Sequence, residues 1–240
     1  MAALAVATAA FLANPAPARG CGVPPPGSPP GFRCTDGDAE TAPRFRTSVN
    51  YTFSSTRIAF SGDKKADVER SLAAAAFEYR ASDKWALQLS AGLLLAGKMV
   101  FPDSRHDFAH GLSLAIGASY RLLEEKGVLP FVGLTGTFGY ATAKTHEART
   151  DYVGYNAFDL RLGAVAGKTI ADALTIYAAA RVFGGPIFWK LRGESLTGTD
   201  VYKYQIGAGA SVVLWKRVDL FAEGVAFGER MLSAGLGVSY

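Results

Sequence analysis

The chain has 240 residues, a length that suits one large all-β domain or two small domains. It is 49% hydrophobic and 19% charged, with 27 glycines, which is charge-poor for a globular protein of mixed structure. The net charge is only +4 and the basic residues are scattered, so the sequence lacks the basic stripe that nucleic-acid binding requires. We therefore predict a single domain without a nucleic-acid partner, and a weak positive charge compatible with anionic lipid.

Residues 1–18 have the pattern of a secretory signal peptide. An apolar run extends from Ala2 to Ala13, and the small-x-small sequence Ala16-Pro17-Ala18 precedes Arg19, which predicts cleavage after Ala18. No Lys or Arg precedes the apolar run, so the true translation start is expected to lie further upstream. Because the run is shorter than the about 20 residues of a transmembrane helix, we interpret it as an export signal.

Residues 19–45 form a Pro/Gly-rich segment that contains both cysteines. Cys21 and Cys34 enclose the sequence GVPPPGSPPGFR. In an exported chain this spacing favours a disulfide, and closing so short a loop stabilises the folded state by roughly 3 kcal/mol. The alternative is lipid modification of Cys21, but residues 18–20 lack the aliphatic residue expected three positions before a modified cysteine.

From Arg46 to the last residue, stretches with alternating apolar and small polar residues are separated by turn signals, the pattern of half-buried strands. This pattern predicts ten strands. Eight or twelve are alternatives, because a short terminal hairpin is easily miscounted. The ten predicted strands are Arg46–Phe60, Val68–Arg80, Trp85–Phe101, His110–Leu122, Val128–Ala143, Tyr155–Lys168, Leu174–Trp189, Val201–Leu214, Val218–Phe227 and Met231–Tyr240.

The connections between these strands alternate in length. Short links (ASDK, LEEKG, TIADA and WKRVD) interleave with longer ones such as PDSRHDFA, KTHEARTDYVG and KLRGESLTGTD. Transmembrane barrels have short turns at one rim and longer loops at the other. The fold class predicted is therefore all-β, a transmembrane up-and-down antiparallel β-barrel with both chain ends at the short-turn rim.

The two faces of the predicted strands differ in bulk. In WALQLSAGLLLAG one face carries Trp85 and four leucines, while the other carries Gln88 and mostly small residues. A soluble lipocalin-like barrel would instead have long charged side chains on its polar face. We therefore expect the bulky face to contact lipid and the small face to line a crowded lumen. Aromatic residues near strand ends are expected to form interfacial girdles; they are Tyr79, Trp85, Tyr120, Trp189, Tyr204 and Trp215.

Over roughly Arg46–Tyr240 the chain resembles the small bacterial outer-membrane β-barrel proteins. In that family the last strand ends in an aromatic residue with hydrophobic residues at alternate positions before it, and the barrel-assembly machinery recognises this signal. The matching residues here are Leu232, Ala234, Leu236, Val238 and Tyr240. The resemblance implies a location in the outer membrane of a Gram-negative bacterium, with outer-membrane lipid, lipopolysaccharide and the assembly machinery as partners. It implies no particular activity.

Seven charged residues are predicted to face the lumen: Glu78, Arg80, Asp159, Arg161, Arg181, Lys203 and Glu223. Singly buried charges are costly, so these side chains should pair with one another or contact water. Barrels of about eight strands are filled with side chains and those of about 16–18 strands hold a channel. We interpret the charges as an ion-pair network in a largely filled lumen; a narrow pore for small solutes is the alternative. Gly184–Pro186 predicts a bulge near the outer rim.

The long links also contain residues that could serve an enzyme. FPDSRHDFAH supplies Ser104, His106 and His110, and KTHEARTDY supplies His146. A His beside a hydroxyl could activate a nucleophile, but the motifs of omptin proteases and of outer-membrane lipid A deacylases are not matched. A metal site would require the three histidines to converge from different loops. We predict a structural or surface-interaction role through the outer loops, without catalysis, cofactor or metal, and rank a hydrolase third after the channel.

Overall fold

The computed structural model describes residues 44–147, 152–171, 173–191, 194–215 and 217–240. The predicted signal peptide, the Pro/Gly-rich segment and the Cys21–Cys34 disulfide lie outside these residues. In the described part, helices long and apolar enough to cross a membrane are absent.

The described chain is built from β-strands. They are β1 (Phe45–Phe60), β2 (Lys64–Arg80), β3 (Trp85–Val100), β4 (Arg105–Leu123), β5 (Phe131–His146), β6 (Val153–Ile170), β7 (Leu174–Gly184), β8 (Ile187–Leu191), β9 (Glu194–Asp200), β10 (Tyr204–Trp215), β11 (Val218–Gly228) and β12 (Arg230–Ser239). Every predicted strand has a counterpart. The predicted strand Leu174–Trp189 is divided at Gly184–Pro186 into β7 and β8, a break rather than the predicted bulge.

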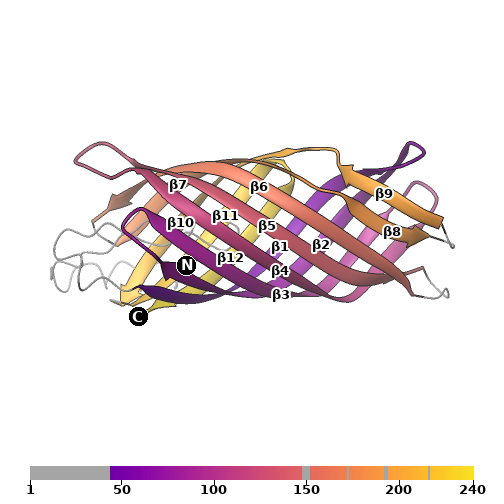
Figure 1. Ribbon diagram of the computed structural model, residues 1–240, viewed down its shortest axis with the longest axis horizontal. Coiled ribbons are helices and arrows are strands. Elements are labelled where there is room, and N and C mark those ends of the chain that lie inside the picture. Colours follow the sequence, from indigo (N-terminus) through magenta and orange to yellow (C-terminus); the bar gives the residue numbers. More distant parts are fainter. Residues whose placement is uncertain (1–43, 148–151, 172, 192–193, 216) are drawn as a thin grey trace, which may run out of the picture.

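The strands pair antiparallel in an up-and-down order, and the sheet closes on itself. Closure occurs where β12 pairs with β1, from Arg46 opposite Ser239 to Ser55 opposite Arg230. Figure 1 shows a long barrel of steeply tilted strands, with the C-terminus at the end opposite β8 and β9. The predicted all-β barrel is therefore confirmed. We call the rim with β8 and β9 the outer rim and the rim with Phe45 and Tyr240 the inner rim.

The number of strands changes along the barrel axis. Six strands, β1 to β6, run through the whole wall; near the inner rim β7, β10, β11 and β12 complete a ring of ten. The hairpin of β11 and β12 turns at Glu229, well short of the outer rim. Above it β8 pairs with β6, and β9 pairs with β1 at Ile58–Phe60, so the outer ring has eight strands. The barrel thus narrows to a width that side chains alone can fill.

The predicted long loops at the outer rim are mostly strand extensions. Arg105–His110 belongs to β4, 144–146 to β5, and Glu194–Asp200 forms β9. The correction has a physical reason: β4 and β5, with 19 and 16 residues, are longer than the about 9–11 residues that span a membrane. Their outer ends therefore project beyond the hydrocarbon core of the bilayer, where strands carry the polar side chains that are otherwise typical of loops.

The outside of the barrel carries a broad apolar belt. Leu89 is 60% exposed and Leu232 is 64% exposed, and both belong to a large set of outward-facing apolar side chains. A contiguous apolar surface of this kind is unfavourable in water and marks a membrane-facing wall. The belt reaches the inner rim at Phe45, Trp85 and Tyr240, and it ends below the outer rim, where Arg57 pairs with Asp67.

Most of the predicted girdle residues lie on this outer surface, and the rings of Trp85 and Tyr120 pack at an angle with centroids 4.9 Å apart. Trp189 is the exception, and its placement corrects the prediction: it is only 1% exposed and lies inside the barrel. Side chains alternate between the two faces of a strand. Trp189 is an even number of residues from the inward-facing Arg181, so it also faces inward.

Candidate functional site in the barrel lumen

An aromatic plug fills the outer ring of eight strands. The plug is the buried cluster Ile58, Phe60, Ala66, Val68, Leu94, Met99, Phe108, Ala143, Tyr155, Ala157, Ile187, Trp189 and Leu196. Each of the eight strands contributes at least one member. Since the narrow ring leaves room for side chains only, these residues fill its interior.

Trp189 lies at the centre of the plug. Its ring stacks on Phe101 with centroids 5.4 Å apart and lies 5.6 Å from the ring of Phe60. His106 meets it edge-on at 4.9 Å. Its indole Nε1 donates a hydrogen bond of 2.8 Å to Thr145 Oγ1, so the polar edge of the tryptophan is satisfied inside the barrel. β8 therefore supplies the side chain around which the plug is packed.

A charged layer lies directly below the plug, where the wall changes from eight strands to ten. Glu229, in the turn between β11 and β12, accepts hydrogen bonds from Gln205 Nε2 at 2.6 Å and pairs with Arg161 Nη1 at 2.9 Å. Arg70 reaches the same carboxylate at 3.5 Å. Arg161 also binds Asp159, two residues before it on β6. The short β11–β12 hairpin thus places a buried carboxylate between arginines from opposite walls.

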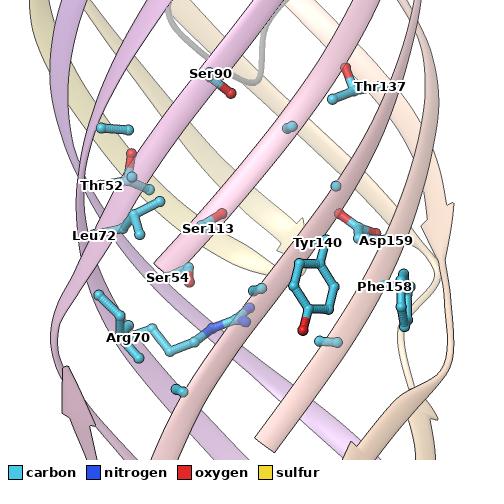
Figure 2. A pocket seen from close by; sticks show the side chains of 18 of the residues that line it. Thr52, Ser54, Arg70, Leu72, Ser90, Ser113, Thr137, Tyr140, Phe158 and Asp159 are labelled. Carbon is cyan, nitrogen blue, oxygen red and sulfur yellow. The ribbon is translucent and has the colours of Figure 1, made fainter. Parts of the chain in front are cut away.

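A cavity of about 240 Å³ lies beside this charged layer. Figure 2 shows Arg70 extending from its strand across the lumen, with Asp159 on the other wall and short side chains such as Ser113 around them. Tyr155 and Phe108 belong to its apolar roof. The Tyr155 hydroxyl and Asp159 Oδ1 are buried and have no hydrogen-bond partner among the described residues. The cavity is large enough to hold water at these two polar atoms.

Two buried ion pairs occupy the lumen nearer the inner rim. Arg181 donates to Glu223 Oε1 at 2.7 Å and to Oε2 at 2.9 Å, in the bidentate geometry that favours arginine–carboxylate pairs. Arg46 makes the corresponding pair with Asp219, at 2.7 Å and 3.2 Å. Both pairs are almost completely buried. The lumen is therefore obstructed at several levels.

The structure brings six of the seven predicted lumen residues to the inner face of the barrel. Asp159, Arg161, Arg181 and Glu223 take part in the contacts described above, and Glu78 is buried near the inner rim. Arg80 also faces inward but lies at the rim and bonds to Asp83 in the turn, at 2.8 Å. Lys203 departs from the prediction: its side chain is exposed in the break between β9 and β10.

Sequence reasoning missed Arg46, Arg70, Asp200, Asp219 and Glu229. Alternation could have found Arg70, which shares the face of Glu78 on β2. The sequence predicts a loop at Asp200, yet this residue lies inside the barrel and accepts a hydrogen bond from Thr56 at 3.0 Å. Glu229 sits in a turn, and turn residues carry no alternation signal. Its burial depends on the shortness of the β11–β12 hairpin.

The histidines proposed for an enzyme do not converge. His106 is 3% exposed and packs within the aromatic plug, where its Nε2 lies 3.3 Å from Ser104 Oγ. His110 and His146 point outward from β4 and β5. Groups of three residues suitable for a metal ion are not found in the described parts of the chain. Ser104 and His106 are thus the one hydroxyl–imidazole contact that the described residues provide at the outer rim.

The residues of the predicted assembly signal share the lipid-facing side of β12. They are Leu232, Ala234, Leu236, Val238 and Tyr240, all exposed on the apolar belt. The backbone of Tyr240 exchanges hydrogen bonds with Phe45, at 2.9 Å and 3.0 Å. Its hydroxyl lies 3.0 Å from Thr47 Oγ1. Tyr240, which directly follows β12, thereby contributes to barrel closure.

Neither a protein-family profile nor a characterised protein sequence matches the chain. Several solved structures match it. The outer membrane protease OmpT from Escherichia coli has a TM-score of 0.54 at 10% identity, covering 85% of this chain and 99% of that chain. The translocator domain of the autotransporter NalP from Neisseria meningitidis has a TM-score of 0.48 at 13% identity, covering 85% of this chain and 91% of that chain.

The outer membrane protein OprG from Pseudomonas aeruginosa also matches, with a TM-score of 0.43 at 12% identity, covering 83% of this chain and 96% of that chain. The likeness to OmpT, together with the closed antiparallel sheet, shows that the chain has the fold of a small outer-membrane β-barrel. At such identities a shared fold carries no activity from one protein to another.

Proposed function

We propose that this chain is a closed, non-conducting barrel of the Gram-negative outer membrane, with a structural or surface-interaction role at its outer rim. The aromatic plug is the observation that carries the proposal. It draws on every strand of the outer ring, and its aromatic members contact one another around Trp189. Displacing a plug of this size would cost the burial energy of several aromatic side chains, about 1.5–3 kcal/mol for each.

The ion pairs below the plug support the same function. Arg181–Glu223 and Arg46–Asp219 are buried, bidentate pairs. Side chains held in this way are poor elements of a conducting path, because each pair would have to break and rehydrate to let an ion pass. The cavity of about 240 Å³ lies between these obstructions. We therefore assign the charged residues to fixing strand register, and rank a narrow channel second.

The outer rim offers a surface suited to contacts outside the membrane. Above the apolar belt the strands carry exposed ion pairs, including Arg57 with Asp67 at 2.6 Å and Lys98 with Glu69 at 2.9 Å. Exposed pairs of this kind contribute little to stability. Their presence on rigid strand ends, rather than on flexible loops, gives a polar surface of fixed shape. That property suits recognition of a partner outside the membrane.

Single-channel recording tests the closed lumen. The refolded chain, checked first by heat-modifiable mobility on a gel, would be inserted into planar bilayers, with a wide-pore porin as the positive control. We expect insertion without discrete conductance steps. Steady ohmic steps from the wild-type barrel would overturn the proposal and favour the channel.

A further inference from the structure

Two lysines flank a glycine on the outer surface of the barrel. Lys144 on β5 lies directly opposite Gly154 on β6. On the other side of β6, Trp189 of β8 lies opposite Tyr155, which places Lys190 beside Gly154. Neighbouring strands are about 4.8 Å apart, so the two lysine backbones are separated by about 10 Å. Both side chains point outward and are exposed.

Neither lysine has a carboxylate partner among the residues that the structure describes. Other lysines on the barrel do: Lys98 pairs with Glu69 at 2.9 Å and Lys168 with Glu125 at 2.8 Å. Between Lys144 and Lys190 the surface is open, because no atom lies within 4 Å of the position that a Cβ on Gly154 would occupy. The two ammonium groups can therefore converge over Gly154 on one ligand.

An aromatic surface lies directly below the lysines on the same strands. The ring of Phe158 on β6 lies 5.0 Å from that of Tyr140 on β5 and 6.3 Å from that of Phe188 on β8. The Tyr140 hydroxyl donates to Asn156 Oδ1 at 2.8 Å. Outward aromatic residues at this position mark the membrane–water interface. Lys144 and Lys190 therefore lie at the level of the lipid head groups.

We propose that Lys144 and Lys190 bind a phosphate group of a phosphorylated glycolipid in the outer leaflet, whose acyl chains lie on Tyr140, Phe158 and Phe188. A phosphate monoester carries about −1.5 to −2 charges at pH 7, which two lysines match. Asp107, two rows further out on β4, does not compete, because it is bonded to Arg105 at 2.8 Å. The inference rests on the outer-membrane location proposed above and does not depend on the closed lumen.

Native mass spectrometry of the detergent-refolded full chain with diphosphoryl lipid A tests the site. The K144Q/K190Q double variant is expected to bind about 25-fold more weakly, or about fivefold for each lysine, from the usual attraction of a lysine near an anionic surface. Lys98→Gln is the matched control, since this outward lysine is already paired with Glu69, and it should bind like the wild type. Gly154→Leu retains both charges, fills the gap between them and should also weaken binding.

Three comparisons separate the possible outcomes, and heat-modifiable mobility confirms that each variant is folded. Equal binding of lipid A after phosphatase treatment would overturn the phosphate contact. Displacement by inorganic phosphate at the concentration of the lipid would overturn its assignment to a glycolipid. If Lys98→Gln lost as much lipid A binding as the double variant, binding would depend on general surface charge and not on this site. Conductance is a separate readout, so a conducting barrel that binds lipid A would refute only the closed lumen.

Discussion

Tyr177 and Glu223 form a hydrogen bond across an intervening strand. Both lie opposite Gly209 of β10, Tyr177 on β7 and Glu223 on β11. Because Gly209 has no side chain, the Tyr177 hydroxyl passes over it and donates to Glu223 Oε2 at 3.0 Å. Arg46 crosses Gly237 in the same way to reach Asp219. The inward glycines thus allow long side chains to connect strands that are not neighbours.

Gly209→Ala should destabilise the barrel for this reason. A Cβ at this position would lie 2.3 Å from the Tyr177 hydroxyl oxygen and 2.7 Å from the backbone oxygen of Ala222, so both must shift. Overpacking of this kind costs about 1–3 kcal/mol. Urea unfolding of the refolded barrel, followed by tryptophan fluorescence, measures the difference.

Gly224→Ala is the matched control for that experiment. Gly224 faces outward on β11, and no atom lies within 4 Å of its Cβ position. Its substitution should change the free energy of unfolding by less than about 0.5 kcal/mol. Equal effects of the two substitutions would show that the crossing over Gly209 is not sterically required.

Removing one member of the Arg181–Glu223 pair should be more harmful than removing both. The side chains are 3% and 0% exposed, so Glu223→Leu leaves a buried arginine charge without its carboxylate, at a cost of about 3–5 kcal/mol. The double variant Arg181→Met/Glu223→Leu removes both charges and should recover much of that loss. Equilibrium unfolding of the single and double variants gives the coupling energy.

An exposed pair provides the comparison. Glu69→Gln removes the partner of Lys98, whose side chain is 38% exposed, and should cost less than about 1 kcal/mol. If Glu223→Leu were no more destabilising than Glu69→Gln, the lumen pairs would not fix the strands as proposed.

The ten-strand barrel was predictable because one rule, alternation, acts on every residue of the wall. Leu89 and Gln88 face opposite sides of β3 whatever the rest of the chain does, and a period of two survives errors of a few residues at strand ends. The same rule would have placed Trp189 inside the barrel, since it shares the face of Arg181. Its position near a strand end suggested a girdle instead.

The β8–β9 hairpin was not predictable from the local sequence. KLRGESLTGTD contains glycines and charges and looks like a loop, and only Leu196 carries an inward apolar signal on β9. β9 forms because β11 and β12 stop at Glu229, which leaves β1 unpaired at Ile58–Phe60 until β9 pairs with it. Because β1 lies far from β9 in the chain, the sequence around β9 does not reveal this pairing. Alternation predicts that Lys203 faces the lumen, but this holds only within a strand. Lys203 lies outside one, because β10 begins at Tyr204.

Trp189→Ala should loosen the outer end of the barrel. The substitution removes the central ring of the plug and its hydrogen bond to Thr145, and truncating a buried aromatic residue costs about 3–5 kcal/mol. Trp85→Ala makes the same chemical change on the lipid-facing side and should cost less. Urea unfolding compares the two, and a larger effect of Trp85→Ala would contradict the role given to the plug.

His106→Ala should weaken the plug without abolishing any hydrolytic activity. The Ser104 Oγ to His106 Nε2 distance of 3.3 Å suits a nucleophile and base, yet His106 packs against Phe101 and Trp189. We therefore expect Ser104 to resist a fluorophosphonate probe, which labels activated serines. Labelling of the wild type that is lost in both Ser104→Ala and His106→Ala would reverse this assignment and support an enzyme.

Tyr240→Ala should impair assembly of the barrel, while Tyr240→Phe should be tolerated. The ring of Tyr240 stacks on Phe45 with centroids 6.1 Å apart, at the point where β12 closes on β1. Phenylalanine keeps this contact and the aromatic end expected of an assembly signal, and it loses only the hydroxyl near Thr47. The fraction of heat-modifiable protein recovered from outer membranes measures assembly, and we expect a severalfold decrease for Tyr240→Ala. Refolding into detergent separates the two roles of the ring, because a closure defect persists there, whereas loss of a recognition signal affects assembly only in cells.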